Sequence, residues 1–228
     1  MWACFLTLVW LDSTSDQALQ SALAKEQAGD DAGAVASLTT LSRANPIWDL
    51  PHLELARLAL KEGGNMDAAL LHLEVAESVA PENPRGQYLF GLWYEERGKT
   101  LKARAAFERA VLFRPNYPEA RFRLGGLYLA ADEPDSAVAQ FSAIKRLDPT
   151  ATQARLQLAQ AEEKQGNPSA AESELKSLHA EQPESKAVTR RLAELYERTL
   201  RPKLAQRLRA ELAPASPRHL RALPRSRR

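Results

Sequence analysis

The chain has 228 residues, of which 44% are hydrophobic and 26% charged, and its formal net charge is +2. This length supplies a sizeable core for one or two domains. Helix-forming residues dominate and runs of β-branched residues are nearly absent, which predicts an all-α protein. The only cysteine is Cys4, so the sequence excludes a disulfide framework and a cysteine-based metal site.

An apolar run, MWACFLTLVWL, begins the chain and stops before Asp12. It is shorter than the roughly 20 residues of a membrane-spanning helix, and it lacks the positive residues that open a signal peptide. Three interpretations of residues 1–14 stay open. The segment is a signal or anchor truncated by a misplaced start codon, a helix or strand that packs on the first repeat, or a short anchor that associates weakly with a membrane surface.

A period of about 34 residues organises the rest of the chain. Prolines recur at intervals of 35, 34, 34, 34 and 34 residues, at Pro46, Pro81, Pro115, Pro149, Pro183 and Pro217. Alanines keep the same period at Ala34, Ala69, Ala103, Ala137, Ala171 and Ala205. Each unit reads as two amphipathic helices joined by a turn, with the proline ending the second helix. In the third unit we expect helices over about 85–97 and 100–114.

The residues inside each unit match the pattern of a known family. The third unit carries, in order, Phe90-Gly91, Tyr94, Gly98, Ala103, Phe107, Ala110 and Pro115. This pattern resembles the tetratricopeptide repeat (TPR) family, whose unit has 34 residues. Six units tile the chain as 15–48, 49–83, 84–117, 118–151, 152–185 and 186–219, the last a polar cap. The resemblance implies a right-handed superhelical solenoid of helix-turn-helix units, an α-α superhelix with a concave inner groove.

The sequence departs from the family at the start of the first helix of each unit. The usual tryptophan is replaced there by Ala18, His52, Gln87, Arg121, Arg155 and Thr189. We assign these replacements no function from the sequence.

Gly98-Lys99-Thr100 matches only the end of a phosphate-binding loop, because Trp93 stands where that loop requires its first glycine. We instead expect Gly98 to be a turn residue with positive φ, and Thr100 to cap the next helix. The same turn position is held by Gly29, Gly63, Asp132, Gly166 and Leu200.

Other catalytic and metal signals are missing from the sequence. The four histidines are scattered and lack metal-ligand spacing, and the chain has no nucleophile motif. We therefore predict no enzyme activity, no metal and no cofactor.

Binding is the remaining function, and the family resemblance implies where it lies. Carried onto this sequence, the groove-lining positions include Leu19, Leu23, Leu53, Tyr88, Leu92, Glu95, Phe122, Leu129 and Leu156. Of these, Tyr88, Leu92, Phe122 and Leu129 exceed what the core needs, so we expect an exposed apolar strip. The alternative is that these side chains pack on neighbouring helices.

The expected partner is an apolar peptide or helix of another protein, lying in the groove. The family's clamp for a terminal carboxylate is absent, because its Lys and Asn positions are filled mainly by apolar residues. The chain thus reads as a non-enzymatic bacterial adaptor. Two alternatives stay open: an envelope assembly factor resembling the pilotins of type IV pilus secretins, and an accessory domain separated from a larger enzyme.

The C-terminal end is basic. From Arg198 to Arg228 the chain has ten Lys and Arg against one acid, so the other 197 residues carry a net charge of −7. We expect residues 220–228 to be a disordered tail that can contact anionic surfaces, without sequence-specific nucleic-acid binding. Localisation stays open, with the cell envelope slightly favoured over the cytoplasm.

Overall fold

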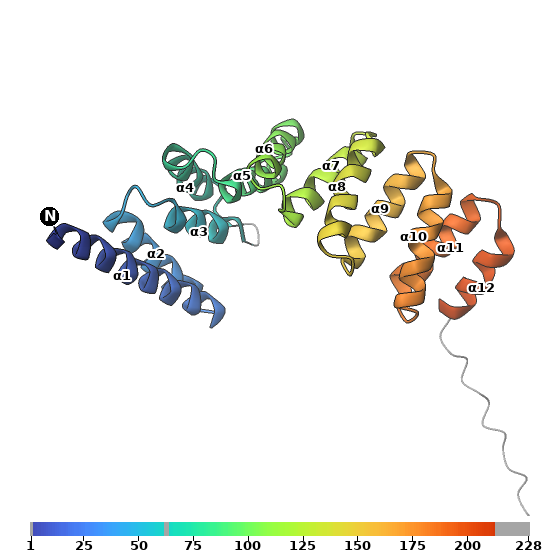
Figure 1. The fold of residues 1–228 in the computed structure, drawn as a ribbon, viewed down its shortest axis with the longest axis horizontal. Helices are drawn as coiled ribbons and strands as arrows, with labels where there is room; N and C mark the ends of the chain where they lie inside the picture. Colours follow the sequence, from blue (N-terminus) through green and yellow to red (C-terminus); the bar gives the residue numbers. More distant parts are fainter. Residues whose placement is uncertain (1, 62–63, 213–228) are drawn as a thin grey trace, which may run out of the picture. The chain divides into compact units, whose positions relative to one another are not determined.

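The structure, a computed structural model, describes residues 2–61 and 64–212, with side chains from Thr14 onward, and its regular elements in these ranges are helical (Figure 1). The helices are α1 (Trp2–Gln27), α2 (Asp31–Ala44), α3 (Asp49–Leu60), α4 (Met66–Val79), α5 (Pro84–Glu96), α6 (Thr100–Phe113), α7 (Pro118–Ala130), α8 (Pro134–Leu147), α9 (Thr152–Lys164), α10 (Pro168–Glu181), α11 (Lys186–Arg198) and α12 (Pro202–Leu212). The all-α prediction is confirmed, and α5 and α6 agree with the expected helices to within one residue.

The helices pack as consecutive pairs, one pair to each 34-residue period. The chain divides into two compact units, residues 1–127 and 128–228. In the first unit α1 packs on α2, α3 on α4, and α5 on α6. In the second unit α9 packs on α10, and α11 on α12. The helical-repeat solenoid expected from the period is therefore the observed architecture.

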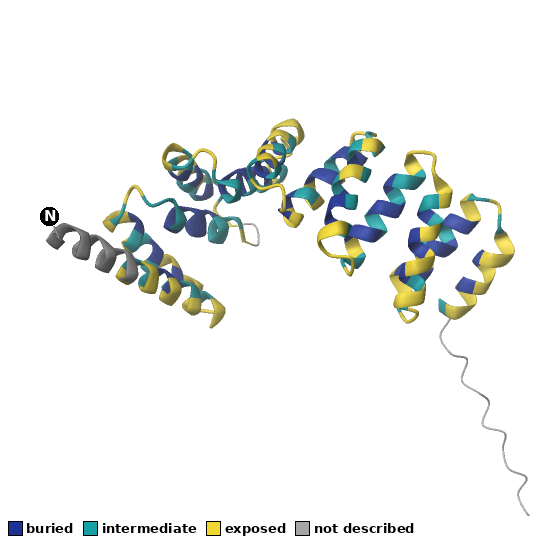
Figure 2. Ribbon diagram, in the orientation of Figure 1, coloured by how far each residue is buried: buried dark blue, intermediate teal, exposed yellow. Residues whose placement is uncertain are grey.

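The core consists of the small and apolar residues that recur with the period. All six periodic alanines are at most 2% exposed, from Ala34 to Ala205. In Figure 2 the buried residues form patches along each helix, and exposed residues gather mainly at the turns. Gly91 illustrates the close packing, because a Cβ placed there would lie 2.3 Å from a ring carbon of Phe107. Small residues at such positions let the two helices of a pair approach closely.

The turns follow the expected signals, with one correction. Each of the first five repeat prolines stands two residues after the end of a helix. The backbone φ is positive at Gly29, Gly98, Asp132, Gly166 and Leu200, as predicted for this turn position, whereas Gly63 lies outside the described residues. The predicted cap at Thr100 is wrong. Thr100 is the first residue of α6, and Lys99 stands at the cap without a capping side-chain hydrogen bond.

The N-terminal segment is continuous with the first repeat helix, because α1 runs from Trp2 to Gln27 across the boundary expected between residues 14 and 15. Within residues 2–61 and 64–212, no helix combines the length and apolar character needed to cross a bilayer. The interpretations of residues 1–14 stay open. The expected tail, 220–228, lies outside the described part of the chain.

Candidate interaction surface

The predicted groove residues lie on the first helices of the repeats, and their surface is called the A face here. In the first unit the A face comprises α1, α3, α5 and α7 up to Leu127; in the second unit it comprises α9 and α11. Leu19 and Leu53 are buried in the core, and Leu23 is half-buried against the same cluster as Leu19. These leucines hold neighbouring helices together, so they offer little surface to a partner.

The residues of the predicted strip in the first unit differ in exposure. Tyr88 is half-buried between Phe107 and Tyr117, with ring centroids 5.7 and 5.2 Å away. Leu92 is half-buried against the core cluster of α3 to α6. Phe122, on α7, is 36% exposed and is the most accessible of the predicted apolar residues. In the first unit the exposed apolar surface on the A face is therefore centred on Phe122.

In the second unit the predicted exposure of the apolar strip is wrong for Leu129, and Leu156 is only partly exposed. Leu129 is only 7% exposed, so it belongs to the core rather than to an exposed strip. Leu156 is half-buried against the cluster formed by α9 to α12. Apolar residues at groove positions pack on neighbouring helices here, which was the alternative interpretation of the pattern.

An open space lies one turn beyond Phe122. Gly126 stands in the interior of α7, and a Cβ added there would meet no atom within 4 Å. Glycine in a helix interior costs about 1 kcal/mol relative to alanine, so packing alone does not favour it here. Phe122 and Gly126, four residues apart, lie on the same face of α7, so an exposed apolar ring lies beside a position without a side chain.

Glu95 takes part in a series of ion pairs that join consecutive first helices. Glu26 Oε1 accepts from Arg57 Nη1 at 2.9 Å, Glu95 Oε2 from Arg123 Nη1 at 3.5 Å, and Glu163 Oε2 from Arg191 Nη2 at 3.1 Å. Burial raises the pKa of Glu95, and the nearby Arg123 opposes that shift. Each pair joins an odd-numbered repeat to the next one, while Leu60 and Leu129 occupy the acid's position in the second and fourth repeats.

The polar residues that replace the family tryptophan have a structural role that sequence reasoning missed. Three of them donate to the carbonyl of the proline six residues earlier: Gln87 to Pro81 at 3.1 Å, Arg121 to Pro115 at 2.7 Å, and Arg155 to Pro149 at 3.0 Å. The sequence signal was the constant spacing of six residues. These side chains fasten the start of each first helix to the turn that precedes it.

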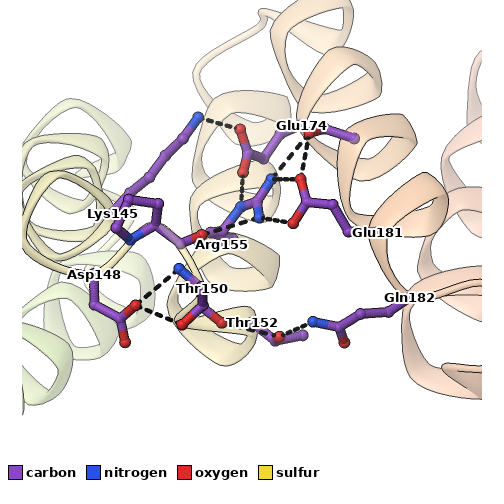
Figure 3. Close-up of polar contacts among 10 residues, drawn as sticks. Lys145, Asp148, Thr150, Thr152, Arg155, Glu174, Glu181 and Gln182 are labelled. Atoms are coloured by element: carbon purple, nitrogen blue, oxygen red, sulfur yellow. Dashed lines mark hydrogen bonds and ion pairs between the residues drawn. The ribbon is translucent and has the colours of Figure 1, made fainter.

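Arg155 is only 4% exposed and belongs to a polar network that joins three helices of the second unit (Figure 3). Its guanidinium contacts Glu174 and Glu181, which both lie on α10, and its Nη1 is 2.6 Å from Oε2 of Glu181. Lys145 of α8 reaches Glu174 from the other side. Arg155 lowers the pKa of Glu181 to about 2, and the pairing raises the pKa of Arg155 itself. The charges are matched among themselves, which indicates packing rather than catalysis.

Glu162 stands near this network without joining it. Its Oε2 is buried and makes no hydrogen bond in the described part of the chain. Burial raises the pKa of this carboxyl, and the charge of Glu174 raises it further, against the opposing effect of Lys145. Three acids and two cations thus gather among α8, α9 and α10, and Glu162 takes up a proton more readily there than an exposed carboxyl does.

A histidine pair lies between α3 and α4. Nδ1 of His52 is 3.1 Å from Nδ1 of His72, and burial lowers the pKa of both rings. The two residues are 20 positions apart, so no local spacing pointed to the contact. Throughout residues 2–61 and 64–212, His, Cys, Asp and Glu side chains form no group of three that could hold a metal ion.

Comparisons with known proteins agree with the architecture. Family models described as "Tetratricopeptide repeat" match residues 95–163 and 152–195. No curated protein gives a significant sequence match.

Three solved structures illustrate the fold similarity. A tetratricopeptide repeat protein from Parabacteroides merdae ATCC 43184 has a TM-score of 0.68 at 23% identity, over 88% of this chain and 79% of that one. YrrB, titled a TPR protein with an unusual peptide-binding site, has a TM-score of 0.67 at 18% identity, over 75% and 88%. PilW, titled a type IV pilus biogenesis factor, has a TM-score of 0.71 at 19% identity, over 87% and 92%.

Proposed function

The chain is a tetratricopeptide repeat protein, and from that premise we propose that it is a non-enzymatic adaptor whose A face binds an apolar segment of another protein. Proteins of this family are usually protein-binding scaffolds and are typically non-catalytic. YrrB, which resembles this chain in fold, is described as having a peptide-binding site.

One observation carries the proposal: the exposed ring of Phe122 beside the open surface at Gly126, where no side chain covers α7. Aromatic side chains are frequent anchors of protein interfaces, because a partner that covers the ring buries a large apolar area. Beside Phe122, the A face of the first unit carries half-buried Tyr88 and Leu92 and the ion pair of Glu95 with Arg123. An apolar partner segment with one protruding side chain suits this surface.

The test replaces Phe122 by a photo-crosslinking phenylalanine analogue in cells of the source organism. A discrete crosslinked protein is then identified by mass spectrometry, and a peptide from its crosslinked segment is titrated against the purified chain. We expect Phe122→Glu to weaken that binding by about thirtyfold or more, as for an interface anchor.

The matched control is Leu112→Glu, because Leu112 is 71% exposed on α6, a second helix of its repeat. This change should leave binding unaltered, and both variants should keep the helical circular dichroism of the parent chain. Equal weakening by the two changes, or binding that survives Phe122→Glu, would contradict a site at Phe122.

A second candidate is an assembly role in the cell envelope. The observation that favours it is the fold similarity to PilW, which extends over 87% of this chain and 92% of PilW. Deletion of the gene in a piliated source strain should then abolish surface pili, with the protein found in the envelope fraction. Normal piliation of the deletion strain would contradict this role.

A further inference from the structure

A small hollow lies among α4, α5 and α6, all in the first compact unit. Its volume is about 180 Å³, and its apolar wall is made by Phe90, Tyr94, Ala105 and Ala106. Polar side chains of the three helices complete the lining. None of the lining residues is among the predicted groove residues, so the hollow is separate from the site proposed at Phe122.

Side chains meet at the equivalent place in two other repeats. His72 contacts His52 in the second repeat, and Glu174 contacts Arg155 in the fifth. In each contact one partner replaces the family tryptophan and the other stands on the second helix of the repeat. Ala106 lies one period after His72 and two periods before Glu174, so the third repeat has only a methyl group at this position.

Gln87 holds the tryptophan position of the third repeat and lines the hollow together with Ala106. Its Nε2 donates to Oε1 of Glu77 at 3.3 Å and to the carbonyl of Pro81 at 3.1 Å. Nη1 of Arg109 lies 3.3 Å from the same oxygen of Glu77. The charges of Glu77 and Arg109 therefore offset each other at the hollow.

Lys102 is a further cation of the hollow, and its charge is not offset. Its side chain is exposed, and its Nζ stands over the ring of Tyr94, 5.7 Å from the centroid. Within the described residues Lys102 enters no ion pair or hydrogen bond. The ammonium group has three hydrogens, so it can bond to an anion while it stays near the ring. The hollow thus combines an aromatic wall with one available positive charge.

We propose that this hollow binds a small aromatic carboxylate, whose ring packs on the apolar wall and whose carboxylate pairs with Lys102. A cavity of about 150 Å³ holds a benzene ring, so this hollow accommodates one substituted ring but not a nucleoside. Aromatic rings attract one another in offset or tilted arrangements, and Phe90 and Tyr94 offer two rings inclined by 24°. A small ligand would thus bind in addition to the protein partner, and either site can fail without the other.

The charges of the hollow favour a monocarboxylate over other ligands. One unpaired ammonium group matches one negative charge, whereas the carboxylate of Glu77 would repel a second. A cationic ligand would meet the like charges of Lys102 and Arg109. An uncharged ring would fill the space but leave Lys102 without a partner.

The test is isothermal titration calorimetry of the full chain with benzoate and with benzamide, its uncharged isostere. We expect benzoate to bind about tenfold more tightly than benzamide, because only benzoate forms a charged pair. Lys102→Met should remove that preference, since it keeps the length of the side chain and removes the charge. The matched control is Lys176→Met on α10, because Lys176 is exposed and lies outside the hollow. It should alter the affinity for benzoate by less than about twofold.

Two substitutions of Ala106 test the space itself. Ala106→Leu should abolish the binding of both ligands by filling the hollow, and Ala106→Glu should do so by placing a carboxylate where the fifth repeat has Glu174. Circular dichroism checks that each variant keeps the parent's helical content, and Phe122→Glu should leave benzoate binding intact. Absence of benzoate binding to the parent chain would overturn the proposal. So would equal affinity for the two ligands, equal losses in Lys102→Met and Lys176→Met, or binding that survives both substitutions of Ala106.

Discussion

At the scale of single residues, the pairing of His52 with His72 makes stability depend on protonation. Two Nδ1 atoms 3.1 Å apart need one hydrogen between them, so one ring donates while the other accepts. When both rings are protonated, two N–H groups and two charges face each other. Burial already lowers the pKa of both rings, and only Asp49 favours the charged form of His52.

The pair predicts a loss of stability in mild acid. Because the folded-state pKa values lie below the unfolded value near 6.5, the unfolded chain takes up protons first as the pH falls. Stability from this pair is then complete above that value and declines below it, by at most about 1.4 kcal/mol per pH unit for each histidine.

Urea unfolding at pH ~7.5 and ~5.5 measures this effect, with His72→Gln as the comparison. The variant should lose less stability than the parent between the two pH values. An identical pH dependence in both proteins would mean that the pair does not titrate in this range.

At the scale of helices, two glycines of first helices have opposite surroundings. Gly91 faces Phe107 inside the pair of α5 and α6, whereas Gly126 on α7 faces open space. Packing therefore requires glycine at position 91, whereas no neighbouring atom requires it at position 126. This contrast separates a glycine that packing requires from one on open surface, which suits the partner site that we propose at Phe122.

Gly91→Ala should therefore lower the free energy of unfolding by about 1–3 kcal/mol, because its Cβ forces the Phe107 ring to move. Gly126→Ala should raise it by up to about 1 kcal/mol through helix propensity. Thermal unfolding of the two variants checks the signs. If Gly126→Ala instead lowers the free energy of unfolding, the added Cβ meets a packing constraint, which would contradict the open surroundings of Gly126.

At the scale of the whole molecule, the chain is a series of helix pairs in two compact units. In such a repeat array stability is close to a sum of contributions from each repeat and its neighbours. Leu73, fully buried between α3 and α4, belongs to the cluster of α3 to α6, whereas α9 to α12 form a cluster of their own. Damage to one cluster is expected to stay local.

Leu73→Ala should cost about 2–5 kcal/mol in its own cluster by leaving a cavity. Hydrogen exchange followed by mass spectrometry should show faster exchange in α3 and α4, with α10 to α12 unchanged. A uniform increase along the chain would indicate one cooperative unit instead.

The sequence predicted the periodic parts of this molecule well, because they depend on contacts inside one repeat. Helix ends, buried alanines and the positive φ at Asp132 all follow from local spacing. The exposure of groove residues was harder, since it depends on packing between helices: Leu129 is buried, and Leu156 packs against the cluster of α9 to α12. The contacts of Arg155 with Glu174 and Glu181, and of His52 with His72, join the two helices of one repeat, so the spacing within a single helix could not predict them.

The ion pairs between first helices limit how the array can be shortened or lengthened. The acids Glu26, Glu95 and Glu163 stand in odd repeats, and their arginine partners stand in even ones. Removing the second, fourth or sixth repeat would leave an acid without its arginine, whereas removing repeats 1–2, 3–4 or 5–6 together leaves the remaining acid–arginine pairs in place. The smallest segment that can be exchanged without dividing an ion pair is therefore two repeats that begin at an odd-numbered one, twice the period of the prolines.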